Sequence, residues 1–386
     1  MNCRKLLLAV LVLAAAQAAA TTLTVRKDGT GDFAVIQQAL DVAADGDTVR
    51  IGPGEYTEST MVRLPGWGSD IESFAHLRCD NLTLIGAGSD ATVIGPTTFQ
   101  GGAGTGSPVG LSYSMNGGFL QVSDLNIHNC YAGVYIAGKL QMNRCNIVDN
   151  RLGVGWDPSG PGGWIRDSDF DVAAPILDPW AFDIGNGGLG SNIDLARCRF
   201  GSPALIRSTL GIAIQDCALK GLGLYSGTQA SVYRCKLVGA NVGISQSLGS
   251  GTYCEVYDSE LDGSYAALSV TGTALGGRFV VENSRLVGGS HGVLWSGNGA
   301  GACIIHNCDF VKGSGPMVQC DISAVAVTHD LRNNYWGTTS EADIQAWIID
   351  HNDHPNYGAT VLYAPFAGQS VPAETTTWGE LKALFR

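Results

Sequence analysis

One repeated template dominates the sequence and restricts what the chain can fold into. Nine segments share a small residue, here called the anchor, with an apolar residue three positions before it and another two positions after it. The residue just before the anchor is always Arg, Asp or Asn, and successive anchors lie 18 to 30 residues apart. The anchors are Cys145, Ser168, Cys198, Cys217, Cys235, Ser259, Ser284, Cys308 and Asn334. A repeat of this length predicts a solenoid.

Each repeat has the pattern of two short strands on either side of a tight bend. In Ile212–Leu219 the apolar side chains alternate, pause at Asp216 and resume, which is typical of strands with one buried face. Asp and Asn tolerate the left-handed backbone of such a bend. Arginine fits this position less well, and it occurs there as Arg144, Arg197 and Arg234. A Gly followed by an aliphatic residue, as in Gly243-Ile244, then indicates a third strand.

Three short strands per turn of roughly 24 residues predict an all-β solenoid. We expect a right-handed parallel β-helix with about eleven coils, because a propeller blade needs about 40 residues and leucine-rich repeats have a different signature. Coils of this kind stack about 4.8 Å apart, so equivalent side chains form ladders inside and outside the helix.

Short helices are expected to cap both ends of the stack. The first follows Asp32, which suits an N-cap, and its apolar face consists of Ile36, Ala39, Leu40 and Ala43. Such a helix would cover the exposed strand edges of the first coil. Near the other end, Ser340 and Asp343 form a capping pair before a second apolar stripe, and residues 360–363 follow as a strand.

The ends of the sequence differ in character from the repeat region. Residues 1–20 have the pattern of a secretory signal peptide, with Arg4 and Lys5 before the apolar run Leu6–Ala16 and small residues after it. This run is too short for a membrane span. We therefore expect a β-helix domain over residues 21–366, and a linker with a short C-terminal tail over residues 367–386. The protein is expected to be a secreted or extracytoplasmic monomer without a membrane span.

Charge and cysteine content narrow the classes of partner. A formal net charge of −12 argues against nucleic acid and anionic membranes, and weakly against polyanionic glycans unless calcium bridges them. Disulfides form in an oxidising compartment. Cys198, Cys217 and Cys235, however, occupy one interior column, so we interpret most cysteines as small buried hydrophobes. Cys303 and Cys308 share one coil and are the best placed to pair.

The start of the mature chain resembles a known group of proteins. Val25–Phe33 and the helical pattern after it resemble the opening of pectinesterases and other pectin-lyase-like proteins, over roughly a tenth of the chain. The resemblance implies a β-helix. It does not extend to esterase chemistry, because the motifs Gln-Asp-Thr-Leu, Asp-Phe-Ile-Phe-Gly and Leu-Gly-Arg-Pro-Trp, which carry the catalytic groups of those enzymes, are missing here. Since such proteins mostly act on polysaccharides, the resemblance also implies a carbohydrate partner.

An acidic run supplies the catalytic candidates Asp167, Asp169 and Asp171. Paired carboxylates could cleave a glycosidic bond as acid and base, and Asp169 and Asp171, two apart on the outward face, could ligate calcium. A lyase would also need a base beside a uronate, for which Arg166 or Arg199 would have to lie in the groove. The simpler interpretation is a solvated acidic turn.

Loops that project from a rigid stack commonly form binding grooves. Near the acidic run, three tryptophans and two further aspartates could bind carbohydrate by ring stacking and hydrogen bonds. These residues are Trp156, Trp164, Trp180, Asp178 and Asp183. The alternative is that the aromatic side chains fix the conformation of their own loops.

Two outward columns are also regular. The position after the anchor alternates in sign over four coils, which predicts a solvated charge ladder of Lys236, Glu260, Arg285 and Asp309. Tyr233 and Tyr257 stack in another outward column.

The function that these observations favour is association with extracellular carbohydrate through a lateral groove, without recognisable catalytic machinery. Two alternatives stay open. One is a polysaccharide lyase or glycoside hydrolase that uses the Asp cluster. The other is a structural or adhesive cell-surface protein held through its tail. No cofactor is expected, and calcium is the one candidate metal, with Asp169 and Asp171 as its candidate ligands.

Overall fold

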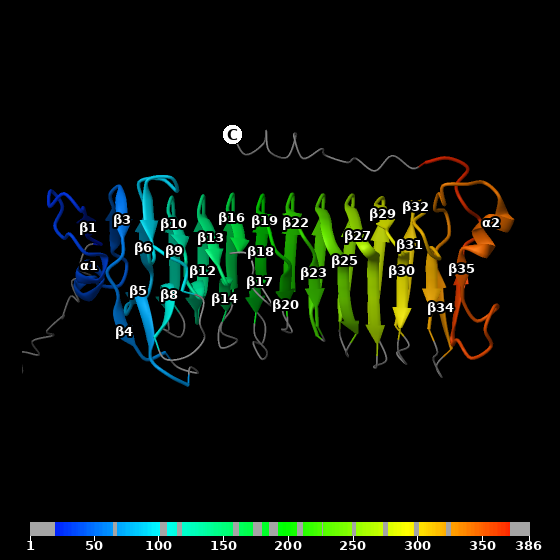
Figure 1. The fold of residues 1–386 in the computed structure, drawn as a ribbon, viewed down its shortest axis with the longest axis horizontal. Coiled ribbons are helices and arrows are strands. Elements are labelled where there is room, and N and C mark those ends of the chain that lie inside the picture. The colour runs from blue at the N-terminus through cyan, green and yellow to red at the C-terminus, as the bar shows by residue number, and fades with distance from the viewer. Residues whose placement is uncertain are drawn as a thin grey trace, which may run out of the picture.

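The chain forms a long row of stacked coils (Figure 1). Its structure, a computed structural model, describes residues 20–64, 68–100, 106–113, 118–156, 162–172, 180–184, 192–206, 211–225, 227–248, 252–272, 277–296, 301–321 and 326–370. The predicted signal peptide up to residue 19, the tail from residue 371 and the candidate Asp178 lie outside the described residues.

One sheet, here called sheet A, runs the whole length of the stack and takes one strand from each coil. Its fourteen strands are parallel. In order they are β1 (Thr22–Val25), β2 (Thr48–Ile51), β6 (Leu82–Ile85), β9 (Phe119–Ser123), β12 (Lys139–Asn143), β15 (Gly162–Arg166), β18 (Asn192–Ala196), β21 (Gly211–Gln215), β24 (Gln229–Tyr233), β26 (Tyr253–Tyr257), β28 (Arg278–Glu282), β31 (Ala302–His306), β34 (Val327–Asp330) and β36 (Ala359–Leu362).

The second sheet, sheet B, has 22 strands and takes up to two strands from each coil. The strands that follow the bend are β3 (Gly54–Tyr56), β7 (Thr92–Ile94), β10 (Asn126–His128), β13 (Asn146–Asn150), β16 (Asp169–Val172), β19 (Arg199–Phe200), β22 (Ala218–Leu219), β29 (Arg285–Gly288) and β32 (Asp309–Val311). The strands on the return side are β5 (Ile71–Leu77), β8 (Ser107–Tyr113), β11 (Ala132–Ile136), β14 (Leu152–Trp156), β17 (Trp180–Ile184), β20 (Ala204–Ile206), β23 (Leu222–Leu224), β30 (His291–Ser296), β33 (Val318–Cys320) and β35 (Ile348–Ile349). Two long strands, β25 (Lys236–Leu248) and β27 (Glu260–Gly272), span both sides, and β4 (Thr60–Val62) pairs antiparallel with β5.

This topology confirms the predicted parallel β-helix. Each strand of sheet A pairs with the equivalent strand of the next coil, and the register matches the repeat: Met142 lies beside Ile165, and Ile214 beside Val232. The stack is longer than the expected eleven or so coils, because β1, β2, β6 and β9 precede the first recognised repeat and β36 follows the last one.

The bend between the two sheets has the left-handed backbone that the sequence pattern predicts. All nine residues before the anchors have φ between 48° and 62°. Left-handed backbone costs a non-glycine residue about 1–2 kcal/mol. The arginines have a partner that offsets this cost, because each reaches back one coil and forms two charge-assisted hydrogen bonds with an aspartate that is itself a bend residue. The pairs are Arg144 with Asp124, Arg197 with Asp167, and Arg234 with Asp216.

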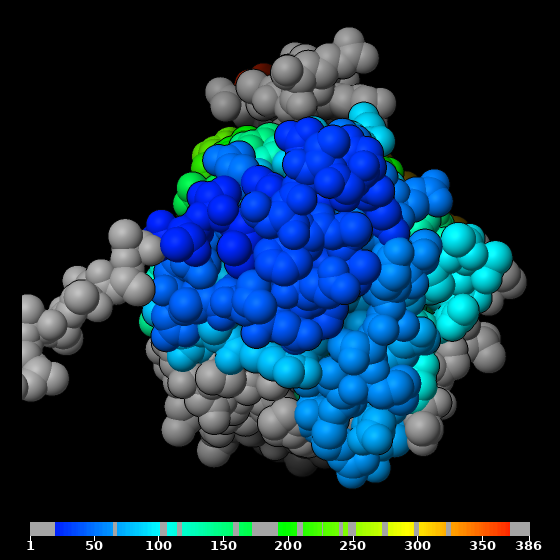
Figure 2. All heavy atoms as spheres, turned by 90° about the vertical axis from the view of Figure 1, so that its left-hand side faces the viewer, coloured from blue at the N-terminus to red at the C-terminus, as the bar shows by residue number. Residues whose placement is uncertain are grey.

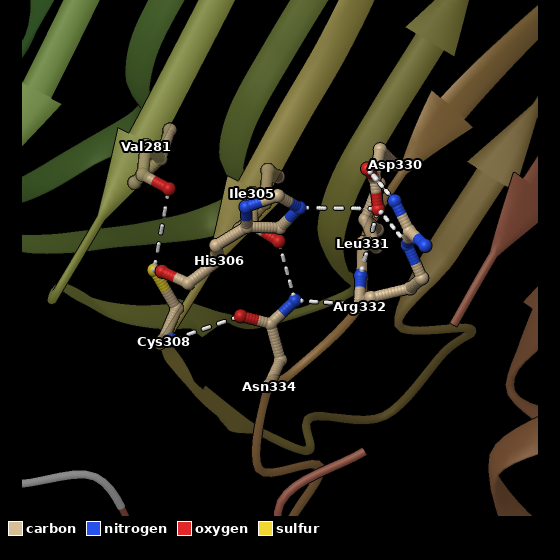
Figure 3. A network of polar contacts seen from close by, with 8 residues as sticks. All are labelled: Val281, Ile305, His306, Cys308, Asp330, Leu331, Arg332 and Asn334. Carbon is tan, nitrogen blue, oxygen red and sulfur yellow. Dashed lines mark hydrogen bonds and ion pairs between the residues drawn. The ribbon is translucent and has the colours of Figure 1, made fainter. Parts of the chain in front are cut away.

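The anchors form a buried column of hydrogen bonds, which explains why these residues are polar as well as small. The backbone N–H of Cys308 donates to Asn334 Oδ1 at 2.8 Å, and Asn334 Nδ2 donates to the carbonyls of Ile305 and Leu331 at 2.7 and 2.8 Å (Figure 3). Ser168, Ser259 and Ser284 accept from the preceding anchor in the same way, at 3.0–3.1 Å. The cysteine anchors take part as well, because Cys217 Sγ accepts from the backbone N–H of Cys198 at 3.3 Å and Cys308 Sγ from that of Ser284 at 3.4 Å.

The described cysteines are unpaired, including Cys303 and Cys308, so the expected pairing of these two is wrong. Both lie in the interior of the stack, where Cys308 hydrogen-bonds with other anchors and Cys303 is part of the apolar core.

Within the described residues, no helix combines the length and the apolar character that crossing a membrane would require.

Helices cover both ends of the stack. The helix α1 (Ile36–Val42) buries Ile36, Ala39 and Leu40 against the first coils, and the N-terminal residues close that end of the molecule (Figure 2). Asp32 is not its N-cap. Its carboxylate accepts from the backbone and hydroxyl of Thr24, and the helix begins after Val35. The helix α2 (Glu341–Ala346) begins as predicted, with Ser340 accepting from the backbone N–H of Asp343.

Candidate functional site

The catalytic candidates Asp167 and Asp169 are held in ion pairs with the next coil. Asp167 is the left-handed bend residue before β16, and both of its oxygens accept from Arg197, at 2.7 and 2.6 Å. Asp169, the first residue of β16, points outward and accepts from Arg199, at 2.7 Å for the Nη2–Oδ2 bond. Both carboxylates thus have a structural partner that would have to be displaced before they could act on a ligand.

Asp171 lies two residues further along the same outward face. Its carboxylate packs against Gly201 of the next coil, where a Cβ would come within 2.3 Å of Asp171 Oδ1. Because residue 201 is a glycine, the Asp171 carboxylate has room to lie against its backbone. Asp169 and Asp171 were also the calcium candidates, and among the described residues no three His, Cys, Asp or Glu side chains are grouped so as to hold a metal ion.

The aromatic candidates do not gather around this acidic run. Trp156 points into the core, is only 2 % exposed and donates its ring N–H to the carbonyl of Gly138, so it is not available to stack on a sugar. Trp164 lies on sheet A, across the bend from Asp169, and its ring is 4.7 Å from the guanidinium of Arg166. Trp180 and Asp183 belong to β17, on the return side of sheet B, and their side chains are outside the described part of the structure.

A surface pocket of about 210 Å³ lies next to the acidic run, on the outward face of sheet B. It spans three successive coils, at strands β19, β22 and β25. Its lining residues are Arg199, Phe200, Gly201, Ala218, Leu219, Lys220, Lys236 and Val238. The pocket has a largely apolar floor and three cationic side chains around it.

The position of the pocket follows from side-chain lengths in two outward rows. The first row runs from Arg199 through Ala218 to Lys236, as the strand register shows. Alanine between two long side chains leaves a hollow. In the second row, two residues further along each strand, Gly201 has no side chain of its own beside Lys220, and the Asp171 carboxylate of the preceding coil takes up part of that space. Short side chains in neighbouring coils thus open the pocket, and long cationic ones form its walls.

The three cations differ in how they are paired. Arg199 holds Asp169, and this hydrogen bonding raises the pKa of the guanidinium, which therefore stays charged. Lys236 Nζ is 3.1 Å from Glu260, a carboxylate that also pairs with Arg285 at 3.1 Å. Lys220 is exposed and has no ion-pair partner among the residues that the structure describes. It is the cation best able to meet a ligand.

Sequence reasoning did not identify Gly201, Lys220 or Lys236 as site residues. The sequence pattern predicts the first outward row as a charge ladder, and the structure confirms the register of Lys236, Glu260, Arg285 and Asp309 in neighbouring strands. The signal for Lys220 is its place in the second outward row, two residues after Ala218. Tyr233 and Tyr257 stack on each other, with ring centroids 5.2 Å apart, so these faces are not presented to a ligand.

Comparison with known proteins gives similarities of fold only. No family model and no curated protein matches the sequence. Among solved structures, the A-module of the Azotobacter vinelandii mannuronan C-5 epimerase AlgE6 aligns with 86 % of this chain and 94 % of its own, at 15 % identity and a TM-score of 0.44. The catalytic unit of the GH87 α-1,3-glucanase from Streptomyces thermodiastaticus aligns with 94 % of this chain and 71 % of its own, at 15 % identity and a TM-score of 0.41. Similarity at this level does not indicate which chemistry this chain performs.

Proposed function

We propose that the protein associates with polysaccharide through the outward face of sheet B, and that the pocket between Arg199 and Lys236 is the contact point. The observation that carries the proposal is a cationic pocket on a strongly acidic chain, with Lys220 unpaired among the described residues at its edge. At about 210 Å³ the pocket is smaller than the roughly 300–1,000 Å³ of most small-molecule sites, so it suits one sugar ring of a longer chain.

The charges favour a sugar that carries a carboxylate or sulfate. Lysine and arginine form strong charge-assisted hydrogen bonds with such anions. The net charge of −12 disfavours a polyanion in general, but a local group of three cations can still bind one acidic ring. The proposal includes the extracytoplasmic location and the monomeric state expected from the sequence.

Binding without turnover is the version of this function that the site supports. Asp167 and Asp169 are engaged by Arg197 and Arg199. Arg199 would have to lose a proton to act as the base of a lyase, and its raised pKa works against that. Asp171 lies against Gly201 of the pocket lining, and one further carboxylate does not make an acid–base couple.

The test is retention of the full chain on a panel of neutral, uronic and sulfated polysaccharides. Lys220→Gln should weaken binding of the preferred glycan about tenfold or more, because a charge-assisted hydrogen bond is worth roughly 1.5–3 kcal/mol. Lys139→Gln is the matched control, since Lys139 is equally exposed but lies on sheet A.

An equal loss in both variants would mean unspecific attraction to a cation and would contradict the pocket as the site. The same mixtures are followed for new reducing ends and for the ultraviolet absorbance of unsaturated sugars. Product from any glycan would contradict the non-catalytic role and would make Asp171 the first residue to replace.

A further inference from the structure

The described end of the chain turns back over the coils that precede it. After β36 the backbone N–H of Asn333 donates to the carbonyl of Pro365 at 2.7 Å, and Ala367 donates to Asn334 at 2.8 Å. The hydroxyl of Ser370 then donates to the Asp309 carboxylate. Asp309 belongs to the coil before Asn334. The chain is thus already moving toward the N-terminal end of the stack, as the red segment in Figure 1 shows.

From Ser370, continuing in the same direction would take the chain along the charge ladder from Asp309 to Lys236, which lines the pocket. Asp309 is followed, coil by coil, by Arg285, Glu260 and Lys236 in paired strands. With coils about 4.8 Å apart, Lys236 lies roughly 14 Å from Asp309 along the stack, and Arg199, two coils further, roughly 24 Å. The pocket occupies this interval between Lys236 and Arg199.

Sixteen residues follow Ser370 in the sequence. An extended chain covers about 3.3–3.6 Å per residue. Glu374 can therefore reach the coil of Lys236, and Trp378, eight residues after Ser370, can reach the whole pocket. An indole ring suits a site of one-ring size, and cationic side chains favour the face of tryptophan.

We propose that residues 371–386 bind along this face of sheet B in the same chain, with Trp378 in the pocket and Glu374 beside Lys236. The tail is then an internal competitor of any ligand of the pocket. Its regulatory consequence rests on the proposed glycan function, whereas the docking itself does not.

Docking is tested in the full chain by photo-crosslinking. Benzoyl-phenylalanine in place of Trp378 should give, within one chain, a crosslink to the segment that contains Lys220. The same group in place of Leu362, an exposed residue of β36, is the control and should not reach that segment. Lys220→Glu combined with Ala218→Leu, which fills the hollow with a larger side chain, should abolish the Trp378 crosslink. A crosslink elsewhere, a crosslink between two chains, or an unchanged yield after the pocket is filled would overturn the proposal.

Competition is tested by glycan binding of the full chain carrying Trp378→Ala. If the tail occupies the pocket about nine-tenths of the time, the apparent affinity should rise about tenfold. Unchanged affinity in a variant whose parent binds glycan would overturn the competitor role. If neither protein binds any glycan, the proposed function fails, and photo-crosslinking alone decides whether the tail docks.

Discussion

The imidazole of His329 is buried among apolar groups near the C-terminal end of the stack. It is 2 % exposed, its Nδ1 accepts from the backbone N–H of Cys303 at 3.2 Å, and its ring lies 4.2 Å from that of Trp295. Burial lowers the pKa of His329 to about 4, because a charged ring would have to give up its hydration there.

We expect the stability of the C-terminal coils to fall as the pH drops from about 6.5 to about 4. In this range the unfolded chain, whose histidine titrates near 6.5, binds a proton that folded His329 does not. The loss should approach about 3 kcal/mol by pH 4. It is measured by urea unfolding and by hydrogen exchange of residues 302–330 at pH 7 and pH 4. His329→Gln retains an acceptor for Cys303 and should flatten this dependence. An unchanged slope in that variant would assign the effect to other groups.

At the scale of elements, α1 matters because it closes the end of a stack whose first strand has an open edge. It presents Ile36, Ala39 and Leu40 to the core while Val42 is 60 % exposed. Gln37 adds a second link, since its side chain hydrogen-bonds to both the N–H and the carbonyl of His76 in β5. The helix therefore stabilises the first coils through one apolar face and one amide clamp.

Leu40→Ala should destabilise the N-terminal coils by about 2–5 kcal/mol, the usual cost of a cavity at a buried leucine. Val42→Ala, two residues away on the exposed side, should change stability by no more than about 0.5 kcal/mol. Limited proteolysis and hydrogen exchange of β1, β2 and β6 would show the difference. Equal effects of the two variants would mean that the helix does not cover the core.

The elements could be predicted from sequence to the extent that they repeat. Anchors, bends and inward columns recur in nine coils, so the alternation of Ile212, Ile214 and Leu219 is sufficient to define their strands. Trp156 could have been placed correctly by the same rule, because it is two residues from the inward Val154. The pocket could not be located in this way. It depends on the chance alignment of Ala218 and Gly201 with long neighbours in other coils.

For the whole molecule, stability is a sum over neighbouring coils. In a solenoid each repeat contacts only the repeats beside it, so a local defect is felt locally. Aromatic pairs such as Phe170 with Phe200 and Phe310 with Trp336, with ring centroids 5.0 and 4.5 Å apart, link adjacent coils and reach no further.

Ile214→Ala in the middle of the stack should lower protection against hydrogen exchange in β18, β21 and β24, and progressively less in coils further away. The local loss is expected to be about 2–5 kcal/mol, since Ile214 is fully buried. Ala213→Ser, on the outer face of the same strand, is the control. A uniform loss of protection from β1 to β36 would instead indicate a single cooperative unit.

The unpaired cysteines make it possible to measure how fast individual coils open. Nine of the ten described thiols are buried, and they are spread along the stack from Cys130 to Cys320. Burial raises the pKa of Cys145 and of Cys320 to about 12, so neither reacts as a thiolate while its coil is closed. Each thiol becomes alkylable only during the moments when its own coil opens. The order in which the buried thiols are alkylated would therefore show the order in which the coils of the β-helix unfold.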